Sequence, residues 1–267
     1  MMNYFVWDID PILLALGPLK IRWYGLMFAS AFMTSYGFMY WIYKREQKNV
    51  EDLDRMLWYL AIGTVVGARL GHCLFYDPAY YFSHPLKILA IWEGGLASHG
   101  AFIGILISLY LYKLKTDDSY IWLMDRVAVS CILGASLIRI GNFFNSEILG
   151  IPTDVPWAVI FSRIDYLPRH PVQLYESAGY ALVFLVLIFA YKKTAYLPIK
   201  GLLTGLFTTL VFLLRFLLEF VKTEQAAYAN ELSLTTGQFL SIPFFLIGVA
   251  FIIWSLRNYR TNNLSSG

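Results

Sequence analysis

The chain has 267 residues, of which 58% are hydrophobic and only 15% are charged, and its mean hydropathy is +0.56. Soluble domains average about 45–50% apolar and about 25% charged residues, so this composition excludes an ordinary soluble domain and indicates a membrane protein. The two cysteines, Cys73 and Cys131, lie inside apolar runs. That placement favours buried thiols over a disulfide or a metal-binding pair.

Apolar runs follow one another along the chain, each close to the roughly 20 residues that cross the hydrocarbon of a bilayer. We therefore predict an all-α polytopic membrane protein with about seven transmembrane helices in a single membrane domain, residues 1–267. The predicted spans are Trp23–Tyr43, Met56–Tyr76, Ala97–Leu114, Ile121–Asn145, Leu174–Tyr191, Ile199–Val221 and Gly237–Leu256.

We also predict the structure of three segments that lie outside these spans. Residues 1–22 are only partly apolar and lack the basic start of a cleavable signal peptide, so we expect an interfacial N-terminal arm. Residues 86–92 are too short to span a membrane and are expected to form an interfacial helix. Residues 146–173 carry four prolines among aromatic and apolar residues, which indicates a small folded cap rather than a linker.

Lysine and arginine are distributed unequally between the two sides of the predicted bundle. One side carries Lys44, Arg45, Lys48, Arg55, Lys113, Lys115, Lys192, Lys193, Lys200, Arg257 and Arg260. The other carries Lys20, Arg22, Lys87, Arg163, Arg169 and Lys222. Because cytoplasmic loops hold the excess of basic residues, we place the N-terminus outside, the C-terminus in the cytoplasm and the cap on the extracytoplasmic side.

Three arginines remain inside the predicted spans. With a helical rise of about 1.5 Å per residue, Arg139 lies about 27 Å, Arg215 about 24 Å and Arg69 about 20 Å along its span from the cytoplasmic end. Tyr24 and His99 each begin a span from outside. We therefore expect these five groups to converge in the outer half of the membrane. Charged side chains persist there only where they face protein, water or a ligand.

Helical spacing groups some of these side chains. Arg139, Asn142 and Ser146 are at i, i+3 and i+7, which is one face of a helix. Arg215 and Glu219 are i, i+4 neighbours, a spacing as typical of a structural ion pair as of a binding site. Three guanidiniums exceed what the nearby carboxylates neutralise, so an anion would complete the set. The planar guanidinium fork suits a phosphate group.

For other polar groups the sequence is compatible with a structural role as well as with a functional one. Arg69 is as compatible with an ion pair to a carboxylate such as Glu93 as with substrate binding. His99 has glycines on both sides, and its placement beside the arginines favours a functional role, since an imidazole serves as a general base near neutral pH. The polar run 169–176 enters the fifth span from outside, where it would either hold a headgroup or seal the end of the helix.

At these residues the chain resembles the prolipoprotein diacylglyceryl transferase family of bacterial membrane enzymes. The family pattern Gly-Arg-x-Gly-Asn-Phe-x-Asn-x-Glu-x-x-Gly is matched at Arg139, Gly141, Asn142, Phe143, Asn145, Glu147 and Gly150. Ile138 stands where the pattern has its first glycine, and Ala101 replaces the last glycine of the usual His-Gly-Gly. Further similar segments, in the expected order, are Tyr24–Met27, Gly67–Gly71, Glu93–Gly100, Pro152–Trp157, His170–Glu176 and Arg215–Glu219.

The resemblance implies transfer of the diacylglyceryl group from phosphatidylglycerol to the lipobox cysteine of a prolipoprotein. This reaction forms a thioether, releases glycerol phosphate and is the first step of bacterial lipoprotein maturation. The resemblance further implies a multi-pass protein of the bacterial inner (plasma) membrane, surrounded by membrane lipids, with no metal, no organic cofactor and no nucleic-acid partner. We expect a monomer with its active site toward the extracytoplasmic leaflet.

The resemblance also suggests roles for individual residues. Arg139 and Arg215 are expected to bind phosphate and stabilise the leaving group, and His99 is expected to generate the thiolate, although a thiol also ionises partly without a base. The residues expected to hold or shape the headgroup site are Tyr24, Arg69, Asn142, Asn145, Glu147, Gly150 and Glu219.

The residues alone leave two other function classes open. A transporter of an anionic solute would also need intramembrane arginines, but the chain shows no matching halves. A structural membrane subunit would use Gly63, Gly67 and Gly71, spaced at four residues, for helix packing.

Overall fold

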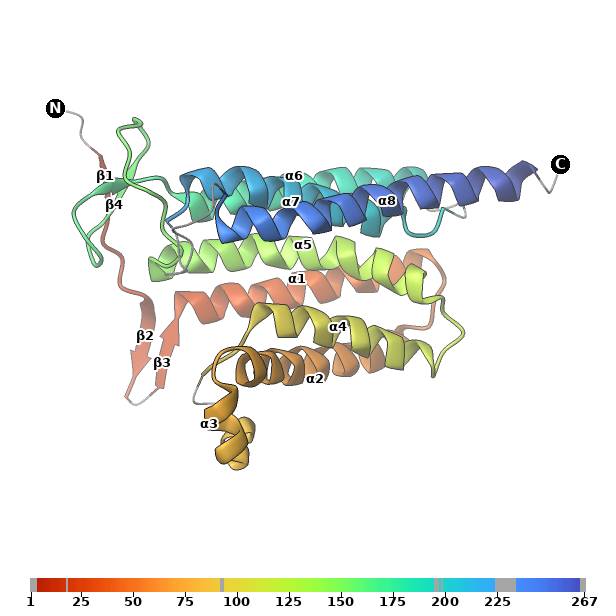
Figure 1. Cartoon of the computed structure of the whole chain (residues 1–267), viewed down its shortest axis with the longest axis horizontal. Coiled ribbons are helices and arrows are strands. Elements are labelled where there is room, and N and C mark those ends of the chain that lie inside the picture. The colour runs from red at the N-terminus through yellow and green to blue at the C-terminus, as the bar shows by residue number, and fades with distance from the viewer. Residues whose placement is uncertain are drawn as a thin grey trace. The chain divides into compact units, whose positions relative to one another are not determined.

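The computed structural model describes residues 4–17, 19–91, 94–194, 197, 199–223 and 234–264. Figure 1 traces the helices and strands of the chain. The chain forms two compact units. The first consists of Met1–Phe38 and Asp125–Gly267, and the second consists of Met39–Met124. Both α1 (Trp23–Arg45) and α5 (Tyr120–Asn145) therefore contain residues of each unit.

The long helices follow the predicted apolar runs. They are α1 (Trp23–Arg45), α2 (Val50–Phe75), α4 (Ser98–Lys113), α5 (Tyr120–Asn145), α6 (Val172–Thr194), α7 (Leu202–Leu218) and α8 (Thr236–Leu264). Within the described residues, five helices are long and apolar enough to cross a membrane: α2, α5, α6, α7 with the adjoining 3-10 turn η3 (Glu219–Val221), and α8. The chain is thus a multi-pass membrane protein by length and composition. That α1 and α4 also cross the membrane stays a prediction.

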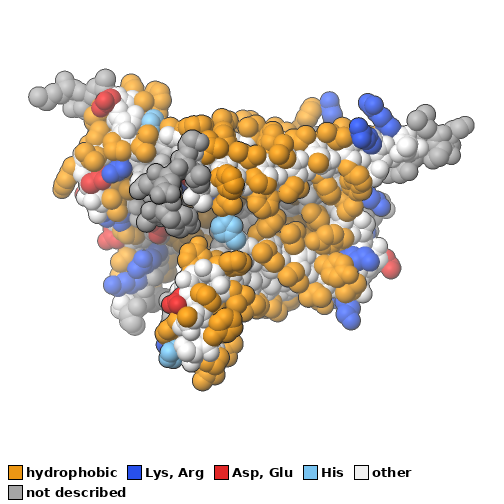
Figure 2. All heavy atoms as spheres, viewed as in Figure 1, with side chains coloured by type: hydrophobic (Ala, Val, Ile, Leu, Met, Phe, Trp, Pro, Cys, Tyr) orange, Lys and Arg blue, Asp and Glu red, His pale blue; other side chains and the backbone are white. Residues whose placement is uncertain are grey.

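Figure 2 shows hydrophobic side chains covering the face over the long helices, with lysine and arginine gathered toward the helix ends. Exposed leucine, isoleucine, phenylalanine and tryptophan side chains occur on α1, α2, α4, α6, α7 and α8. Such a surface is stable against lipid tails, whereas a soluble monomer rarely exposes an apolar patch larger than a few hundred Å².

Short strands add two small sheets to a chain that the sequence predicted to be all-α. In one sheet β4 (Val159–Phe161) lies between β1 (Phe5–Trp7), which it pairs in parallel, and β5 (Pro168–Arg169), which it pairs antiparallel. The other sheet is a hairpin of β2 (Ile12–Leu16) and β3 (Leu19–Arg22). Strands of two to five residues are too short to leave a clear alternation in sequence.

An aromatic core joins the N-terminal strand to the end of α5. Trp7, Phe143, Val159 and Phe161 are all buried. The rings of Trp7 and Phe143 have centroids 4.3 Å apart, and those of Phe143 and Phe161 are 5.6 Å apart. Because Phe143 belongs to the last turns of α5, this core fixes the helix end from which the polar side chains extend.

A second fixed point lies at the start of α5. The buried carboxylate of Asp125 accepts the backbone N–H of Gly201 at 2.7 Å, the N–H of Thr204 at 2.8 Å and the Thr204 hydroxyl at 2.7 Å. Gly201 is the N-cap of α7 and has a φ of 91°, a left-handed conformation that glycine adopts without a Cβ clash. An anion at this position also complements the positive end of the helix dipole.

In the second unit α2 and α4 pack closely and antiparallel along a row of glycines. A Cβ added to Gly63 would lie 2.8 Å from the carbonyl oxygen of Gly104, and one added to Gly71 would lie 2.7 Å from the Cα of Gly100. Small residues let helix backbones approach in this way. Beside the contact runs an apolar groove of about 560 Å³, lined by residues such as Trp58, Ile62, Val66, Leu70 and Leu111.

The connection from α2 to α4 contains α3 (Pro78–Ser83) and the 3-10 helix η1 (Pro85–Leu89). The predicted short helix over residues 86–92 thus corresponds to η1, although Trp92 lies outside the described residues. Leu86 and Leu89 are largely exposed. Their exposure fits a segment at the membrane interface, which stays a prediction.

Candidate active site

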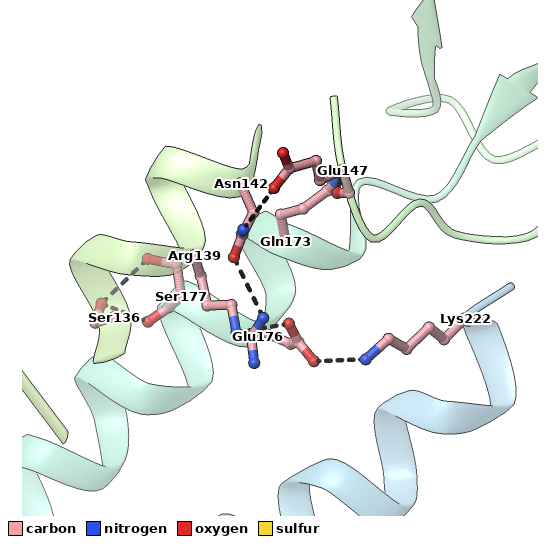
Figure 3. A network of polar contacts seen from close by, with 8 residues as sticks. All are labelled: Ser136, Arg139, Asn142, Glu147, Gln173, Glu176, Ser177 and Lys222. Carbon is pink, nitrogen blue, oxygen red and sulfur yellow. Dashed lines mark hydrogen bonds and ion pairs between the residues drawn. The ribbon is translucent and has the colours of Figure 1, made fainter. Parts of the chain in front are cut away.

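Arg139 lies near the C-terminal end of α5 and contacts two other polar side chains (Figure 3). Its Nη1 donates to the Oδ1 of Asn142 at 3.2 Å, which is the contact that their i, i+3 spacing predicts. Its Nε lies 2.9 Å from Oε2 of Glu176, on α6. Within the described residues that oxygen has no hydrogen-bond partner, so the contact is an ion pair without hydrogen-bond alignment. The arginine is therefore held by groups from two helices.

The Glu147 carboxylate accepts hydrogen bonds from both asparagines of the motif. One oxygen accepts the side-chain amide of Asn142 at 3.1 Å, and the other accepts that of Asn145, also at 3.1 Å. The backbone carbonyl of Glu147 accepts a hydrogen bond from the buried Gln173 of α6 at 2.5 Å. Arg139, Asn142, Glu147 and Asn145 thus form one connected chain of contacts, and their binding of a headgroup stays a prediction.

The turn that carries Glu147 is strained in its backbone. Ser146 and Ile148 both have positive φ angles, 55° and 56°, which non-glycine residues adopt rarely and at some energetic cost. Arg163 supports the turn, because its Nη2 donates to the Phe144 carbonyl at 2.8 Å and to the Ser146 hydroxyl at 2.7 Å. A cation at the C-terminal end of α5 also complements the helix dipole.

Two glycines of the motif permit close approaches. A Cβ at Gly141 would lie 3.0 Å from the ring of Tyr24, so the predicted site residue Tyr24 packs directly on the turn of α5 that follows Arg139. A Cβ at Gly150 would lie 2.4 Å from the carbonyl oxygen of His170. These contacts favour a steric role for Gly150, which the sequence had assigned to substrate binding.

Arg215 lies in the last turn of α7, and its Nε atom is buried without a hydrogen-bond partner in the described part of the chain. Tyr180, a buried residue of α6, lies within electrostatic range of both Arg215 and Arg139. The guanidinium carbon of Arg139 is 5.9 Å from the centre of its ring. The two predicted phosphate-binding arginines therefore share Tyr180 as a neighbour.

The i, i+4 ion pair between Arg215 and Glu219 is not formed among the described contacts. Glu219 is the C-cap of α7 with a right-handed helical backbone, and its N–H donates to the Arg215 carbonyl, so the helix still connects the two residues and only their side chains diverge. Its carboxylate lies instead beside Gly237 in the first turn of α8, where an added Cβ would be 2.3 Å from Oε1. An anion is favourable at this helix N-terminus.

Two other predicted site residues, Arg69 and His99, belong to the second unit. Arg69 is buried and donates to the carbonyls of Lys87, Ile88, Gly94 and Gly95, at distances of 2.5 to 3.2 Å. A guanidinium has five N–H groups, and these contacts use four of them. The geometry therefore favours a structural role that holds η1 and residues 94–95. The alternative partner Glu93 lies outside the described residues.

His99 is an exposed residue in the first turn of α4. The next residue, Gly100, packs against α2, where an added Cβ would meet the carbonyl oxygen of Gly67 at 2.1 Å. The histidine is thus carried on a backbone that cannot shift without separating α4 from α2. Its role as a base stays a prediction.

Comparison with known proteins agrees with the motif. The family model described as prolipoprotein diacylglyceryl transferase matches residues 11–254. A relative from Chloroherpeton thalassium, named phosphatidylglycerol–prolipoprotein diacylglyceryl transferase, is 49% identical over 264 residues, which cover 98% of each chain. The chain belongs to the prolipoprotein diacylglyceryl transferase family.

Other relatives with the same name extend this result. One from Tolumonas auensis is 49% identical over 252 residues, which cover 94% of this chain and 97% of its own. One from Bacteroides fragilis is 41% identical over 260 residues, which cover 93% and 94%. The prolipoprotein diacylglyceryl transferase family is a family of transferases, so this chain is an enzyme of that class.

In this transferase the site contains residues that the sequence had not assigned to it. Glu176 was only part of the polar run 169–176, and Lys222 was counted only as a basic residue outside the membrane. Both contribute to the buried ion-pair cluster around Arg139. A signal was present for Glu176, because a carboxylate inside an apolar helix needs a cationic partner. Nothing in the sequence indicated a partner for Lys222, because it lies just after the predicted span Ile199–Val221, where a lysine can face water.

Proposed function

We propose that the protein transfers the diacylglyceryl group of phosphatidylglycerol to the thiol of a prolipoprotein lipobox cysteine. The observation that carries this proposal is the match over nearly the whole chain to relatives named for that reaction. The cluster of partly buried cations beside the motif gives the match a chemical basis, because phosphatidylglycerol is an anionic lipid. The same match favours a transferase over a transporter of anionic solutes.

Arg139 and Arg215 would bind the phosphate of the lipid. A guanidinium offers parallel N–H donors to phosphate oxygens, and such donors are worth most in a buried site, where they stabilise the charge that develops on the leaving group. Asn142 and Glu147 support this role, because their contacts fix Arg139 in place before substrate arrives. Tyr24, packed on Gly141, would close the site beside them.

His99 would act as general base toward the cysteine. The thiolate is the nucleophile in such a reaction, and an imidazole accepts a proton near neutral pH. Its exposure at the start of α4 leaves the ring accessible to a peptide. This assignment rests on the family motif.

Membrane lipids and the prolipoprotein would approach from the extracytoplasmic leaflet, where the basic-residue asymmetry puts the motif. The apolar groove along α2 and α4 offers a surface suited to lipid acyl chains, because it is lined chiefly by aliphatic and aromatic side chains and by glycines. Residues 146–173, folded around β4 and β5, would receive the peptide. The protein would act as a monomer.

The direct test uses purified protein in detergent or liposomes with phosphatidylglycerol and a synthetic lipobox peptide. Mass spectrometry should detect the peptide with one added diacylglyceryl group, and a peptide in which serine replaces the cysteine should gain none. Phosphatidylcholine in place of phosphatidylglycerol serves as the matched lipid control. Absence of the adduct with active, folded protein would overturn the proposal.

A further inference from the structure

The Glu176 carboxylate is shared by two cations from different helices. Oε2 lies 2.9 Å from Nε of Arg139, and Oε1 lies 3.4 Å from Nζ of Lys222. The Glu176 side chain is only 4% exposed, and that of Lys222 is 12% exposed. Figure 3 shows the lysine reaching the carboxylate from the side opposite Arg139. One buried anion thus holds two partly buried cations near each other.

The backbone around Lys222 is fixed to the residues that follow the motif. Lys222 forms an isolated antiparallel bridge with Gly150. On either side of it, the N–H of Thr223 donates to the Leu149 carbonyl and the N–H of Ile151 donates to the Val221 carbonyl, each at 3.0 Å. The ammonium group is therefore carried into the cluster by a paired segment and not by a free chain.

The cluster has more positive than negative charge. Among the described residues, Arg139, Arg215 and Lys222 contribute three partly buried cations, whereas Glu176 contributes a buried carboxylate and Glu147 an exposed one; the carboxylate of Glu219 lies beside Gly237 instead. Both oxygens of Glu147 already accept side-chain amides. A buried charge is costly unless it is paired. An anionic ligand would remove the excess.

We propose that Lys222 is a third cation of the phosphate site and stabilises the second negative charge of the departing glycerol phosphate. This inference rests on the proposed function. In the reaction the cysteine sulfur forms a C–S bond to the terminal glycerol carbon of the diacylglyceryl group, and the bond from that carbon to the phosphate oxygen breaks. The thiol proton passes to a base. The electron pair stays on phosphate, so a singly charged diester becomes a doubly charged monoester.

The geometry suits a group that acts when this charge appears. Among the described contacts the Lys222 ammonium is held by Glu176 alone, whereas Arg139 contacts both Glu176 and Asn142, so the ammonium has the fewer partners of the two cations. A lysine ammonium is a compact charge on a flexible stem. An interaction made chiefly in the transition state raises kcat, whereas one made equally with the substrate lowers KM.

The test compares Lys222→Gln and Lys222→Arg with the wild-type enzyme in the transfer assay. Loss of one group that stabilises developing charge typically costs about 10²-fold in kcat, so we expect that loss for Lys222→Gln, with KM changed less than about threefold. Inhibition of Lys222→Gln by glycerol phosphate should be about tenfold weaker than inhibition of the wild type. Lys222→Arg should recover most of the wild-type kcat and most of the wild-type inhibition. Lys192→Gln, at the exposed end of α6, is the matched control.

A kcat of Lys222→Gln within twofold of wild type would overturn the inference while leaving the proposed function intact. The proposed function itself would fail only if the wild-type enzyme transferred no diacylglyceryl group. A second measurement avoids dependence on the folding of the variants. Glycerol phosphate should slow acylation of Lys222 in the wild-type protein at least fivefold, as read by peptide mass, without protecting Lys192. Equal protection of the two lysines would contradict the inference.

Discussion

The carboxylate of Asp125 accepts the backbone N–H of Gly201, and this contact sets the register between α5 and α7. Arg139 lies fourteen residues beyond Asp125, and Arg215 lies fourteen residues beyond Gly201. At about 1.5 Å per residue, both arginines lie about 21 Å from the same fixed point. Because both helices leave that point in the same direction, the two guanidiniums reach the same level. Asp125 is thus a positioning residue for the pair.

Asp125→Ala should lower both stability and activity. It leaves the buried N–H groups of Gly201 and Thr204 without an acceptor, at a cost of about 1–3 kcal/mol each in the free energy of unfolding. Thermal unfolding followed by circular dichroism should show a clearly lower Tm, and the transfer rate should fall because the register of the arginines is lost. Asp117→Ala, at an exposed position, controls for loss of charge. An unchanged Tm for Asp125→Ala would refute the argument.

Much of the fold was predictable because apolar runs of membrane length leave a strong periodic signal. The predicted span Ile121–Asn145 and the helix Tyr120–Asn145 differ by a single residue. The short strands were missed because pairing between β1 and β4 is a contact between residues more than 150 positions apart. No local pattern encodes such a contact.

The site was only partly predictable for a related reason. Contacts within one stretch, such as that of Arg139 with Asn142, follow from helical spacing. Contacts between different helices cannot be predicted from the spacing within one helix, and Glu176 and Lys222 were therefore not assigned to the cluster. Arg215 and Glu219 show the opposite case, because the spacing and the helical backbone suit a pair but the Glu219 carboxylate lies beside Gly237 of α8.

Arg139→Lys should be nearly as inactive as Arg139→Ala, although it keeps the positive charge. A lysine ammonium is a compact point charge with three donors, and it cannot reproduce the parallel pair of N–H bonds that the planar fork of arginine offers to a phosphate. We expect a loss of about 10²-fold in kcat/KM. Arg257→Lys, on the exposed end of α8, is the control. Activity of Arg139→Lys within about threefold of wild type would mean that charge alone suffices.

The pH dependence of transfer should reveal whether His99 is the base. If it is, log(kcat/KM) rises with pH across part of the range from about 5 to 8, where imidazoles titrate, and His99→Gln removes that rise. If His99 only shapes the site, the two enzymes give parallel profiles. The measurement requires that chemistry limits the rate, which a burst-free time course establishes.

Gly67→Ala should separate α2 from α4. The added carbon would lie 2.4 Å from the carbonyl oxygen of Gly100, and neither backbone can yield without moving a whole helix. Overpacking of this kind typically costs about 1–3 kcal/mol. Gly37→Ala on α1 is the matched control, because nothing lies within 4 Å of its added Cβ, and it should be neutral or stabilising. Equal Tm values for the two variants would contradict the close packing.

The ion pair between Asp165 and Arg169 should make a small, pH-dependent contribution to stability. Hydrogen bonds from Arg169 hold the pKa of the Asp165 carboxyl below its ordinary value of 3.8. A carboxyl whose pKa is lowered on folding stabilises the protein above its unfolded pKa and loses that effect as the pH falls through the folded pKa. Asp165→Asn should therefore lower the Tm slightly at pH 6 in low salt. Below the lowered pKa the carboxyl is neutral, and in high salt this partly exposed pair is screened, so wild type and variant should converge under either condition. A Tm difference that persisted in acid would show that the side chain acts through packing rather than charge.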